Sequence, residues 1–251
     1  MATISATALA GVPEVHAGDD PARLIATSLD GARISAEDVL VVAHKLISKA
    51  EGRTRRLTEV QPGEHALALA RRLDKDARVV QVVLDESREV RRAERGVLIS
   101  VTHHGFVCAN AGVDASNAPD DDTVILLPAD PDGSARRLRA GMRRLIGTAP
   151  AVLITDSFGR AWRTGQCDVA IGCAGLTALD DWRGRRDIRG RELRATVIAV
   201  ADQLAAAADL ARAKDGMQPA ILVRGAGRWV TAEDGPGVAP LLRDPEHDLF
   251  R

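Results

Sequence analysis

Acidic, hydroxyl and basic side chains follow an apolar run between residues 151 and 168. The run 151–155 predicts a buried strand, which delivers Asp156 and Ser157 into a loop that also carries Arg160 and Arg163. A carboxylate at the end of a buried strand is held rigidly, and a neighbouring hydroxyl can complete the oxygen shell of a metal ion. The alternative is that Asp156 caps a turn and that the arginines pair with Asp168.

A second polar cluster lies between residues 102 and 117. Asn110, Asp114 and Asn117 fall close together beside two glycines, and such oxygen groups suit Mg²⁺ or Mn²⁺, which bind through one or two carboxylates plus substrate phosphate. The alternative is an ordinary turn rich in Asn and Asp. The adjacent histidines 103–104 do not predict zinc, because neighbouring residues of a strand point to opposite faces.

The third polar cluster follows the apolar run 39–43. His44, Lys45, Ser48 and Lys49 come directly after this run, and the lysine ammonium groups could neutralise phosphate oxygens through charge-assisted hydrogen bonds. The alternative is that both lysines are simply solvated at the end of a strand. The sequence has no G-x-x-x-x-G-K-[ST] phosphate loop (Walker A) and no Rossmann G-x-G-x-x-G between a strand and a helix, so a nucleotide would have to bind by another route.

Apolar runs and helical periodicities alternate along the chain, which predicts a mixed α/β or α+β fold. The runs expected to form strands are 39–43, 97–101, 107–109, 124–127, 151–155, 169–173 and 220–223. The segments expected to form helices are 20–28, 64–75, 79–93, 133–146 and 193–214. The expected N-cap of the fourth helix is Asp132 or Ser134. Loops are expected at 51–56, 117–122 and 180–190.

The composition limits the classes of function. The 251 residues are 45% apolar and carry 34 basic against 35 acidic side chains, so we expect a globular chain without the field that favours nucleic acid or a membrane surface. Aromatic residues make up 2%, which argues against base-stacking platforms. The cysteines at 108, 167 and 173 are expected to be structural. Since no signal-peptide pattern and no apolar run of roughly 20 residues occurs, we expect a cytoplasmic protein.

The three polar clusters together resemble those of the coenzyme F-420-0:L-glutamate ligases. The similarity lies in Ser48-Lys-Ala-Glu-Gly52, His104-Gly-Phe-Val-Cys-Ala-Asn-Ala-Gly-Val-Asp-Ala-Ser-Asn117 and Asp156-Ser-Phe-Gly-Arg160, which occur in the family's order. Shorter agreements extend the resemblance over nearly the whole chain. Ordered stretches of this length are far more specific than a single short motif.

The resemblance implies an enzyme that forms an amide bond between L-glutamate and the lactyl carboxylate of F-420-0. GTP would phosphorylate this carboxylate with the help of a divalent ion, Mg²⁺ or Mn²⁺, and the glutamate amine would attack the acyl phosphate. Further γ-glutamyl additions can follow, and K⁺ is an additional candidate ion. The resemblance also implies two intertwined lobes with mixed sheets covered by helices, and an interlocked homodimer. Residues 1–251 would form one unit of a standalone bacterial-type form, without the flavin-reductase domain that some bacterial relatives carry.

Roles for individual residues also follow from the resemblance. The implied metal ligands are Asp114, Asp156 and Ser157, and the implied catalytic residues include Asp156 and Lys49. The implied nucleotide contacts are Val12, Pro13, Glu14, Val15, His44, Lys45, Lys49, Asn117, Arg212, Lys214, Gly216 and Met217. We add Arg160 to the catalytic set, beside Arg163, because the charge of both side chains suits an anionic substrate.

Three positions depart from the family pattern. His44 stands where many relatives carry Ser, Lys214 where some carry a metal-binding acid, and Ser157 where Thr is frequent. The serine keeps the hydroxyl that a metal ligand needs. The other two leave open a non-catalytic protein that binds deazaflavin or nucleotide. The same metal site could also serve another acyl-phosphate ligation or plain nucleotide hydrolysis.

Overall fold

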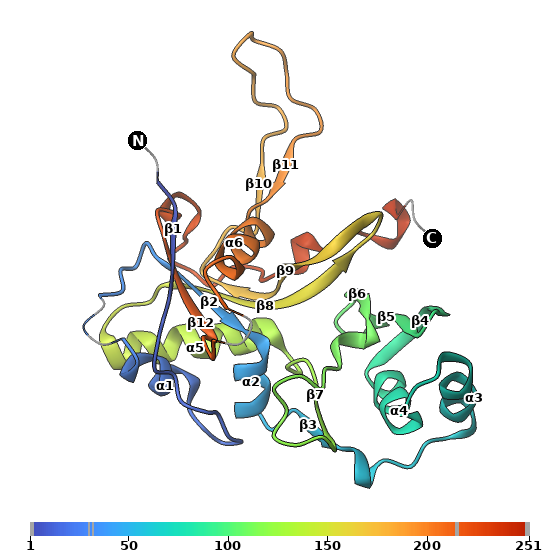
Figure 1. Cartoon of the computed structure of the whole chain (residues 1–251). Helices are drawn as coiled ribbons and strands as arrows, with labels where there is room; N and C mark the ends of the chain where they lie inside the picture. Colours follow the sequence, from blue (N-terminus) through green and yellow to red (C-terminus); the bar gives the residue numbers. More distant parts are fainter. Residues whose placement is uncertain (1–2, 30, 32, 214–215, 249–251) are drawn as a thin grey trace.

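A five-stranded mixed sheet forms the centre of the larger part of the molecule (Figure 1). The structure is a computed structural model, and it describes residues 3–29, 31, 33–213 and 216–248. The strand order is β1 (Ser5–Ala8), β12 (Ala220–Arg224), β2 (Val39–Ala43), β8 (Ala151–Arg160) and β9 (Arg163–Ala174). Of the four strand pairs, β2 with β8 is parallel and the others are antiparallel. Ala43, the last residue of β2, therefore lies beside Thr155 in the middle of β8.

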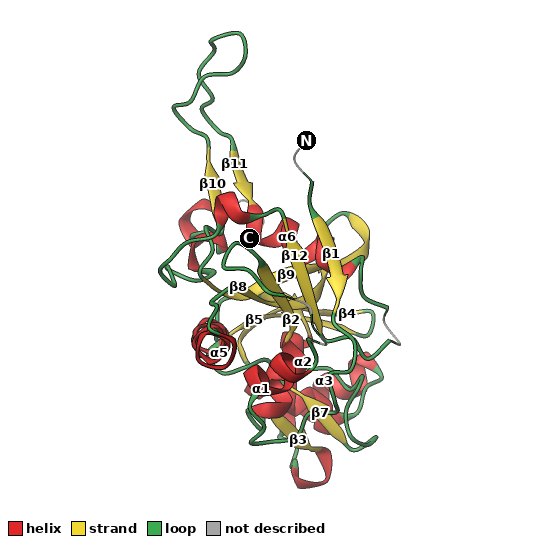
Figure 2. Ribbon diagram, turned by 90° about the vertical axis from the view of Figure 1, so that its left-hand side faces the viewer, coloured by secondary structure: helices red, strands yellow, loops and turns green. Residues whose placement is uncertain are grey.

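Helices cover both faces of this sheet and explain its apolar strands. Helices α1 (Pro21–Thr27) and α5 (Pro131–Ile146) lie on one face, and α6 (Val200–Asp209) lies on the other (Figures 1 and 2). The first four residues of β2 are completely buried, as a strand covered on both faces requires. The short helix α2 (His44–Ala50) begins directly after β2, so the residues of its first turn stand at the strand end.

A smaller lobe packs around its own core beside the sheet (Figure 1). Its elements are α3 (Glu64–Leu73), α4 (Ala77–Asp85), β4 (Ser87–Glu94), β5 (Val97–Thr102) and β6 (Val107–Ala109). The two-stranded ribbon of β3 (Thr54–Arg56) and β7 (Thr123–Ile125) joins it to the larger part. The 3₁₀ turns of the chain are η1 (Leu57–Glu59), η2 (Asn110–Gly112), η3 (Gly227–Trp229), η4 (Ala239–Leu241) and η5 (Pro245–His247). Two cores are consistent with two lobes joined by a ribbon.

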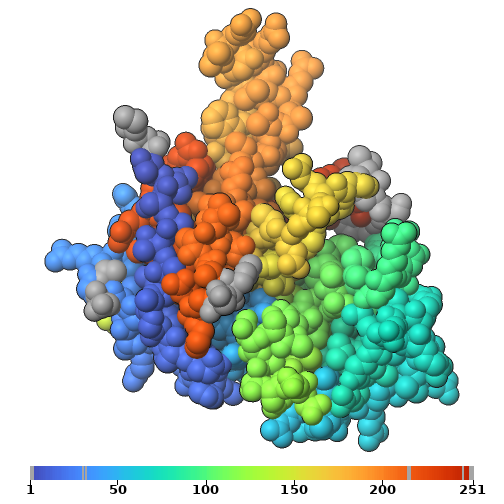
Figure 3. All heavy atoms as spheres, in the orientation of Figure 1, coloured from blue at the N-terminus to red at the C-terminus, as the bar shows by residue number. Residues whose placement is uncertain are grey.

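An extended arm projects from the body of the molecule (Figure 3). Its base is the antiparallel pair of β10 (Leu179–Asp181) and β11 (Val197–Ala199), and the chain between them reaches into solvent. Ile188 near the tip is completely exposed. No helix in the described part of the chain is apolar and long enough to cross a bilayer.

The mixed α/β fold expected from the alternating patterns is confirmed. The helices expected at 20–28, 64–75 and 133–146 are present as α1, α3 and α5. The strands expected at 39–43 and 107–109 have those bounds, and the other expected strands are present with longer or slightly shifted bounds. Apolar strands and strongly amphipathic helices carry the clearest periodic signals, because each buries one continuous face.

Two of the expected helices are wrong in part. The segment 79–93 divides into the end of α4 and most of β4, because Ser87 to Glu94 pair with β5 and this pairing overrides the helical spacing. In the described part of the segment 193–214, which ends at residue 213, only Val200 to Asp209 form α6, since the residues before it belong to the arm. The N-cap of α5 is neither Asp132 nor Ser134 but Asp130, whose Oδ1 accepts a hydrogen bond from the Gly133 N–H at 2.9 Å.

The segment after residue 155 also differs from the expected loop. Strand β8 continues to Arg160 and turns into β9, so that residues 155–168 form a hairpin rather than an open loop. Helix α2 and strands β1, β3, β10 and β11 were not expected from the sequence, because they are short and lack a clear apolar period.

Candidate functional site

A cavity of about 480 Å³ opens where β2 ends beside the middle of β8. Most predicted site residues line it: Val12, Pro13, Glu14, Val15, His44, Lys45, Lys49, Asp114, Asn117, Asp156, Ser157, Arg212 and Met217. Arg160 and Gly216 are not among the lining residues. Lys214 lies outside the described residues. The three polar clusters of the sequence therefore meet at one place, and the chemical roles of their residues stay predictions.

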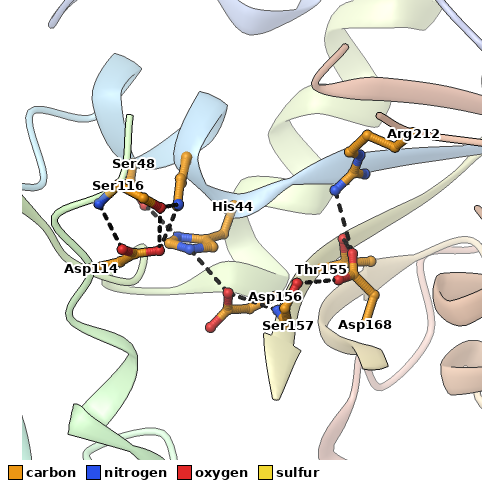
Figure 4. A network of polar contacts seen from close by, with 10 residues as sticks. His44, Ser48, Asp114, Ser116, Thr155, Asp156, Ser157, Asp168 and Arg212 are labelled. Carbon is orange, nitrogen blue, oxygen red and sulfur yellow. Dashed lines mark hydrogen bonds and ion pairs between the residues drawn. The ribbon is translucent and has the colours of Figure 1, made fainter. Parts of the chain in front are cut away.

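The parallel pairing of β2 and β8 brings His44 beside Asp156. Ala43 is the register partner of Thr155, so the residues that follow them come next to each other. His44 Nε2 lies 3.3 Å from Asp156 Oδ1, and His44 Nδ1 lies 3.2 Å from Ser48 Oγ (Figure 4). The His44 side chain is 2% exposed. The buried imidazole thus lies between the Ser48 hydroxyl and the Asp156 carboxylate, and its Nε2 has no hydrogen-bond partner among the described residues.

Lys45 and Asp114 form an ion pair at the mouth of the cavity. Lys45 Nζ lies 2.6 Å from Asp114 Oδ2 and donates to Ser116 Oγ at 2.5 Å. The backbone of Asp114 exchanges two hydrogen bonds with Ile125 of β7, which holds this loop against the ribbon. Burial would raise the pKa of Asp114, but hydrogen bonds from Lys45 and Ser116 outweigh it and lower the pKa below its usual value. Asp114 is therefore ionised at neutral pH.

Lys49 points from α2 towards the N-terminal segment that lines the same cavity. Its Nζ lies 2.5 Å from Glu14 Oε1, and the Lys49 side chain is 11% exposed whereas that of Glu14 is 53% exposed. Lys45 and Lys49 are separated by about one turn of α2, so both ammonium groups reach the cavity from one helix face. Each lysine pairs with a partly exposed carboxylate, and a phosphate group could replace that carboxylate as the partner of the ammonium group.

A second carboxylate, Asp168, is buried in the wall of the cavity. Strand β9 places Asp168 opposite Ser157, and the Asp168 side chain is 1% exposed. Its Oδ1 accepts from Ser157 Oγ at 2.6 Å, and its Oδ2 accepts from Thr155 Oγ1 at 2.9 Å. Arg212 Nη1, from the segment after α6, donates to Oδ2 at 3.4 Å (Figure 4). The sequence did not indicate this cluster, because it depends on the β8–β9 pairing.

The arginines of the hairpin lie away from Asp168. Arg160 Nη2 donates to the Thr164 carbonyl at 3.0 Å, and Arg160 Nε lies 3.4 Å from the Gly165 carbonyl. Arg160 and Arg163 are exposed near the hairpin turn. The expected alternative, in which these arginines pair with Asp168, is therefore wrong, since both are exposed near the turn whereas the buried Asp168 pairs with Arg212. The catalytic role assigned to Arg160 stays a prediction that lacks support from its position.

Two of the three cysteine thiols, Cys108 and Cys173, have the surroundings of structural residues. Cys108 and Cys173 are buried, and burial raises the pKa of each thiol to about 12, with the charges of Asp156 and Asp132 respectively adding to the effect. A thiol with such a pKa is almost entirely protonated at neutral pH, and the thiolate is the nucleophilic form. These two residues are therefore not nucleophiles of the cavity.

The lining residues of the cavity fall within the part of the chain that matches a known family. The family model described as "F420-0:Gamma-glutamyl ligase" matches residues 11–225. The chain belongs to this family. It is 44% identical over 252 residues to the "Coenzyme F420:L-glutamate ligase" of Methanothermobacter thermautotrophicus, which covers 99% of both chains. A protein of that name from Methanopyrus kandleri is 45% identical and covers 95% of this chain and 94% of its own.

A third relative with the same name, from Haloarcula marismortui, is 43% identical and covers 97% of this chain and 94% of its own. The three relatives come from archaea, so they do not support the expected bacterial-type form. The relatives match this chain over nearly its whole length, and the match includes every strand that lines the cavity.

A divalent ion of the kind expected for this ligase family fits the oxygen donors of the cavity. No group of three or more His, Cys, Asp or Glu side chains converges as in a metal cage within the described ranges. Mg²⁺ commonly uses one or two carboxylates and completes its shell with substrate oxygens and water. Asp156 and Asp114 could supply the carboxylates. Ser157 gives its hydroxyl proton to Asp168, so it can offer only lone pairs to an ion, as a ligand must.

Proposed function

We propose that this chain joins L-glutamate to the lactyl carboxylate of coenzyme F-420-0 in a GTP-dependent reaction. The observation that carries the proposal is the single cavity in which two lysines and the carboxylates Asp114 and Asp156 come together. Transfer of a phosphoryl group to a carboxylate brings two anions together, so the site must supply positive charge. The relatives that cover 94% or more of their own chains carry the name of this activity.

The proposed reaction has two steps. In the first, a carboxylate oxygen of F-420-0 bonds to the γ-phosphorus of GTP while the bond to the β-phosphate oxygen breaks, giving an acyl phosphate and GDP. In the second, the glutamate amine bonds to the acyl carbon, inorganic phosphate leaves with the bonding electrons, and the amine loses a proton. Lys45 and Lys49 would neutralise phosphate oxygens, because each ammonium group already faces an anionic partner in the cavity.

We propose that Asp156 and Asp114 hold a divalent ion, Mg²⁺ or Mn²⁺, together with Ser157. Such an ion would neutralise charge on the phosphate oxygens. The chain's own part is to fix the donors. His44 contacts Asp156 Oδ1, and the Ser157 N–H donates to the same oxygen at 2.8 Å, so the carboxylate is oriented before any ligand binds.

The test is incubation of the purified chain with F-420-0, GTP, L-glutamate and Mg²⁺ or Mn²⁺, followed by mass spectrometry. We expect a product heavier than F-420-0 by one or more glutamyl residues, with one GDP formed per addition. Omission of glutamate should leave F-420-0 unchanged in mass, and replacement of GTP by ATP measures nucleotide selectivity. Phosphate release without any acceptor would select hydrolysis instead, and nucleotide binding without turnover would select a non-catalytic binding protein.

We also propose a homodimer, with the arm as a contact between protomers. The arm extends away from the body, and its tip carries the fully exposed Ile188, which a contact would cover. Light scattering coupled to size-exclusion chromatography should give twice the 26.7 kDa mass of the chain. Ile188→Asp should shift the mass towards the monomer, and an unchanged dimer would remove the arm from the proposal.

A further inference from the structure

Asp168 is the most deeply buried carboxylate among the residues that line the cavity. Its described hydrogen-bond donors belong to two separate parts of the chain. The hydroxyls of Thr155 and Ser157 come from β8, and the Arg212 guanidinium comes from the segment after α6 (Figure 4). Thr155 and Ser157 are two positions apart on one strand, so both point to the face on which Asp168 stands. The carboxylate thus ties the middle of β8 to a segment more than 40 residues later.

An ionised carboxylate in this position is costly unless its partners are kept. Removing a charge from water costs several kcal/mol, and this cost is offset when hydrogen-bond donors and a cation surround the group. An apolar residue would fill the same space without the cost. The placement of a carboxylate beside Arg212 therefore indicates that the cation, or the groups it orients, is needed in the cavity.

Arg212 is held at one nitrogen and has two more to offer. Its side chain is 11% exposed and lines the cavity, and Nη1 makes the contact with Asp168. Within the described ranges, Nε and Nη2 are buried and have no hydrogen-bond partner. A buried donor without an acceptor is destabilising. An anionic group of a bound ligand would remove that penalty, since a guanidinium presents its donors in a planar fork that matches phosphate oxygens.

We propose that Asp168 is a positioning residue for the nucleotide: it anchors Arg212 through Nη1 so that Nε and Nη2 bind phosphate oxygens, and it sets the Ser157 hydroxyl to act as an acceptor. This inference rests on the proposed function, because it takes the nucleotide to be the anionic ligand. Asp168 does not touch the reacting atoms. It acts through Arg212 and Ser157, and its loss should affect nucleotide affinity more than any other property.

The test is calorimetric titration of GDP into the full chain, which requires no turnover. Asp168→Asn should weaken GDP binding on the order of 10- to 100-fold, the effect of losing one charge-assisted hydrogen bond. The matched control is Asp202→Asn on α6. Asp202 is also a carboxylate packed against β9, where it accepts from the Ala170 N–H at 2.9 Å, but it does not line the cavity. Asp202→Asn should leave GDP affinity within about threefold.

A double-mutant cycle separates positioning from a general structural role. If Asp168 acts through Arg212, Arg212→Met should weaken GDP binding strongly alone but little further in the Asp168→Asn background. Additive effects, or unchanged GDP affinity in a folded Asp168→Asn variant, would overturn the proposal. If Asp168→Asn does not fold, Arg212→Lys decides, because the three donors of lysine share one nitrogen and cannot reproduce the planar fork that contacts Asp168 and spans phosphate oxygens at the same time. Wild-type affinity of Arg212→Lys would then overturn it.

The outcomes for the proposed function are distinct. The wild-type chain could bind GDP and fail to glutamylate F-420-0, while Asp168→Asn binds GDP more weakly. This result would reject the ligase and keep the positioning role. Glutamylation by the wild type together with unchanged GDP affinity in Asp168→Asn would keep the ligase and reject the positioning role.

Discussion

Asp114 and Asp168 line the same cavity, yet the side chain of the first is 41% exposed and that of the second is 1% exposed. Asp114 belongs to an outer end, which we define as Glu14, Lys45, Lys49 and Asp114. Asp168 belongs to an inner end, which we define as Thr155, Ser157, Asp168 and Arg212. The pair His44–Asp156 stands between them.

The two ends use charge in different ways. The carboxylate partners of the outer lysines, Asp114 and Glu14, are 41% and 53% exposed, so solvent screens these ion pairs in part and the lysines can change partners when a ligand arrives. Removing the partners of a buried carboxylate costs more free energy, because the buried charge would be left without compensation. The outer end is thus suited to capture an anionic ligand, and the inner end is suited to hold the geometry of the strand ends. Variants at each end should separate these properties.

Asp156→Ala, between the two ends, should have the largest effect. The change removes a proposed metal ligand without removing core volume, so kcat should fall by at least about 10²- to 10³-fold while the thermal midpoint stays close to that of the wild type. Glutamylation rate and thermal unfolding measured on the same preparation check both parts. Glu94→Ala, which removes an exposed carboxylate of the small lobe, is the control and should change neither. A folded Asp156→Ala variant with near-normal activity would refute the assignment.

Lys49→Met at the outer end should have an intermediate effect. The ammonium group is proposed to leave Glu14 for a phosphate oxygen, so KM for GTP should rise roughly 10- to 100-fold while the protein stays folded. Initial rates at varied GTP measure the change. Lys75→Met removes a lysine that does not line the cavity and should leave KM unaltered. Equal KM values for the two variants would show that Lys49 only pairs with Glu14.

Part of this comparison was accessible from the sequence. The apolar runs before His44 and Asp156 predict strands, and the polar residues after them predict a ligand edge. The sequence does not specify which strands are neighbours. The 3.3 Å approach of His44 to Asp156 follows only from the parallel register of β2 and β8. Periodic burial can be predicted residue by residue, whereas strand order is a property of the whole sheet.

The inner end was missed for a related reason. Residues 155–168 contain charged residues and glycines, which predicts a loop, but they form a hairpin whose cross-strand pairs bring Ser157 and Asp168 together. The same cause explains the error at β4, since its polar residues become a strand only when β5 is beside them. Segments of this kind are decided by tertiary pairing rather than by local preference.

The pH dependence of stability should give the smallest effect and should distinguish two carboxylates by sign. The pKa of Asp114 is lowered in the folded chain, so its stabilisation is present above the unfolded pKa, about 4, and is lost as the pH falls through the folded pKa. The stability difference between wild type and Asp114→Asn should therefore be constant from pH 7 to about pH 5 and shrink at lower pH. Urea unfolding midpoints at each pH measure it.

Asp132 supplies the opposite sign. Burial raises its pKa, although hydrogen bonds from the N–H groups of Cys173 and Val238 act against this, so the folded state disfavours the carboxylate form. Its destabilising contribution is present above the folded pKa and is relieved as the pH falls through that value. As the pH falls, the urea midpoint of Asp132→Asn should therefore decrease relative to that of the wild type, while the midpoint of Asp114→Asn should increase relative to it. The same trend in both variants would mean that the Lys45 contact does not lower the pKa of Asp114.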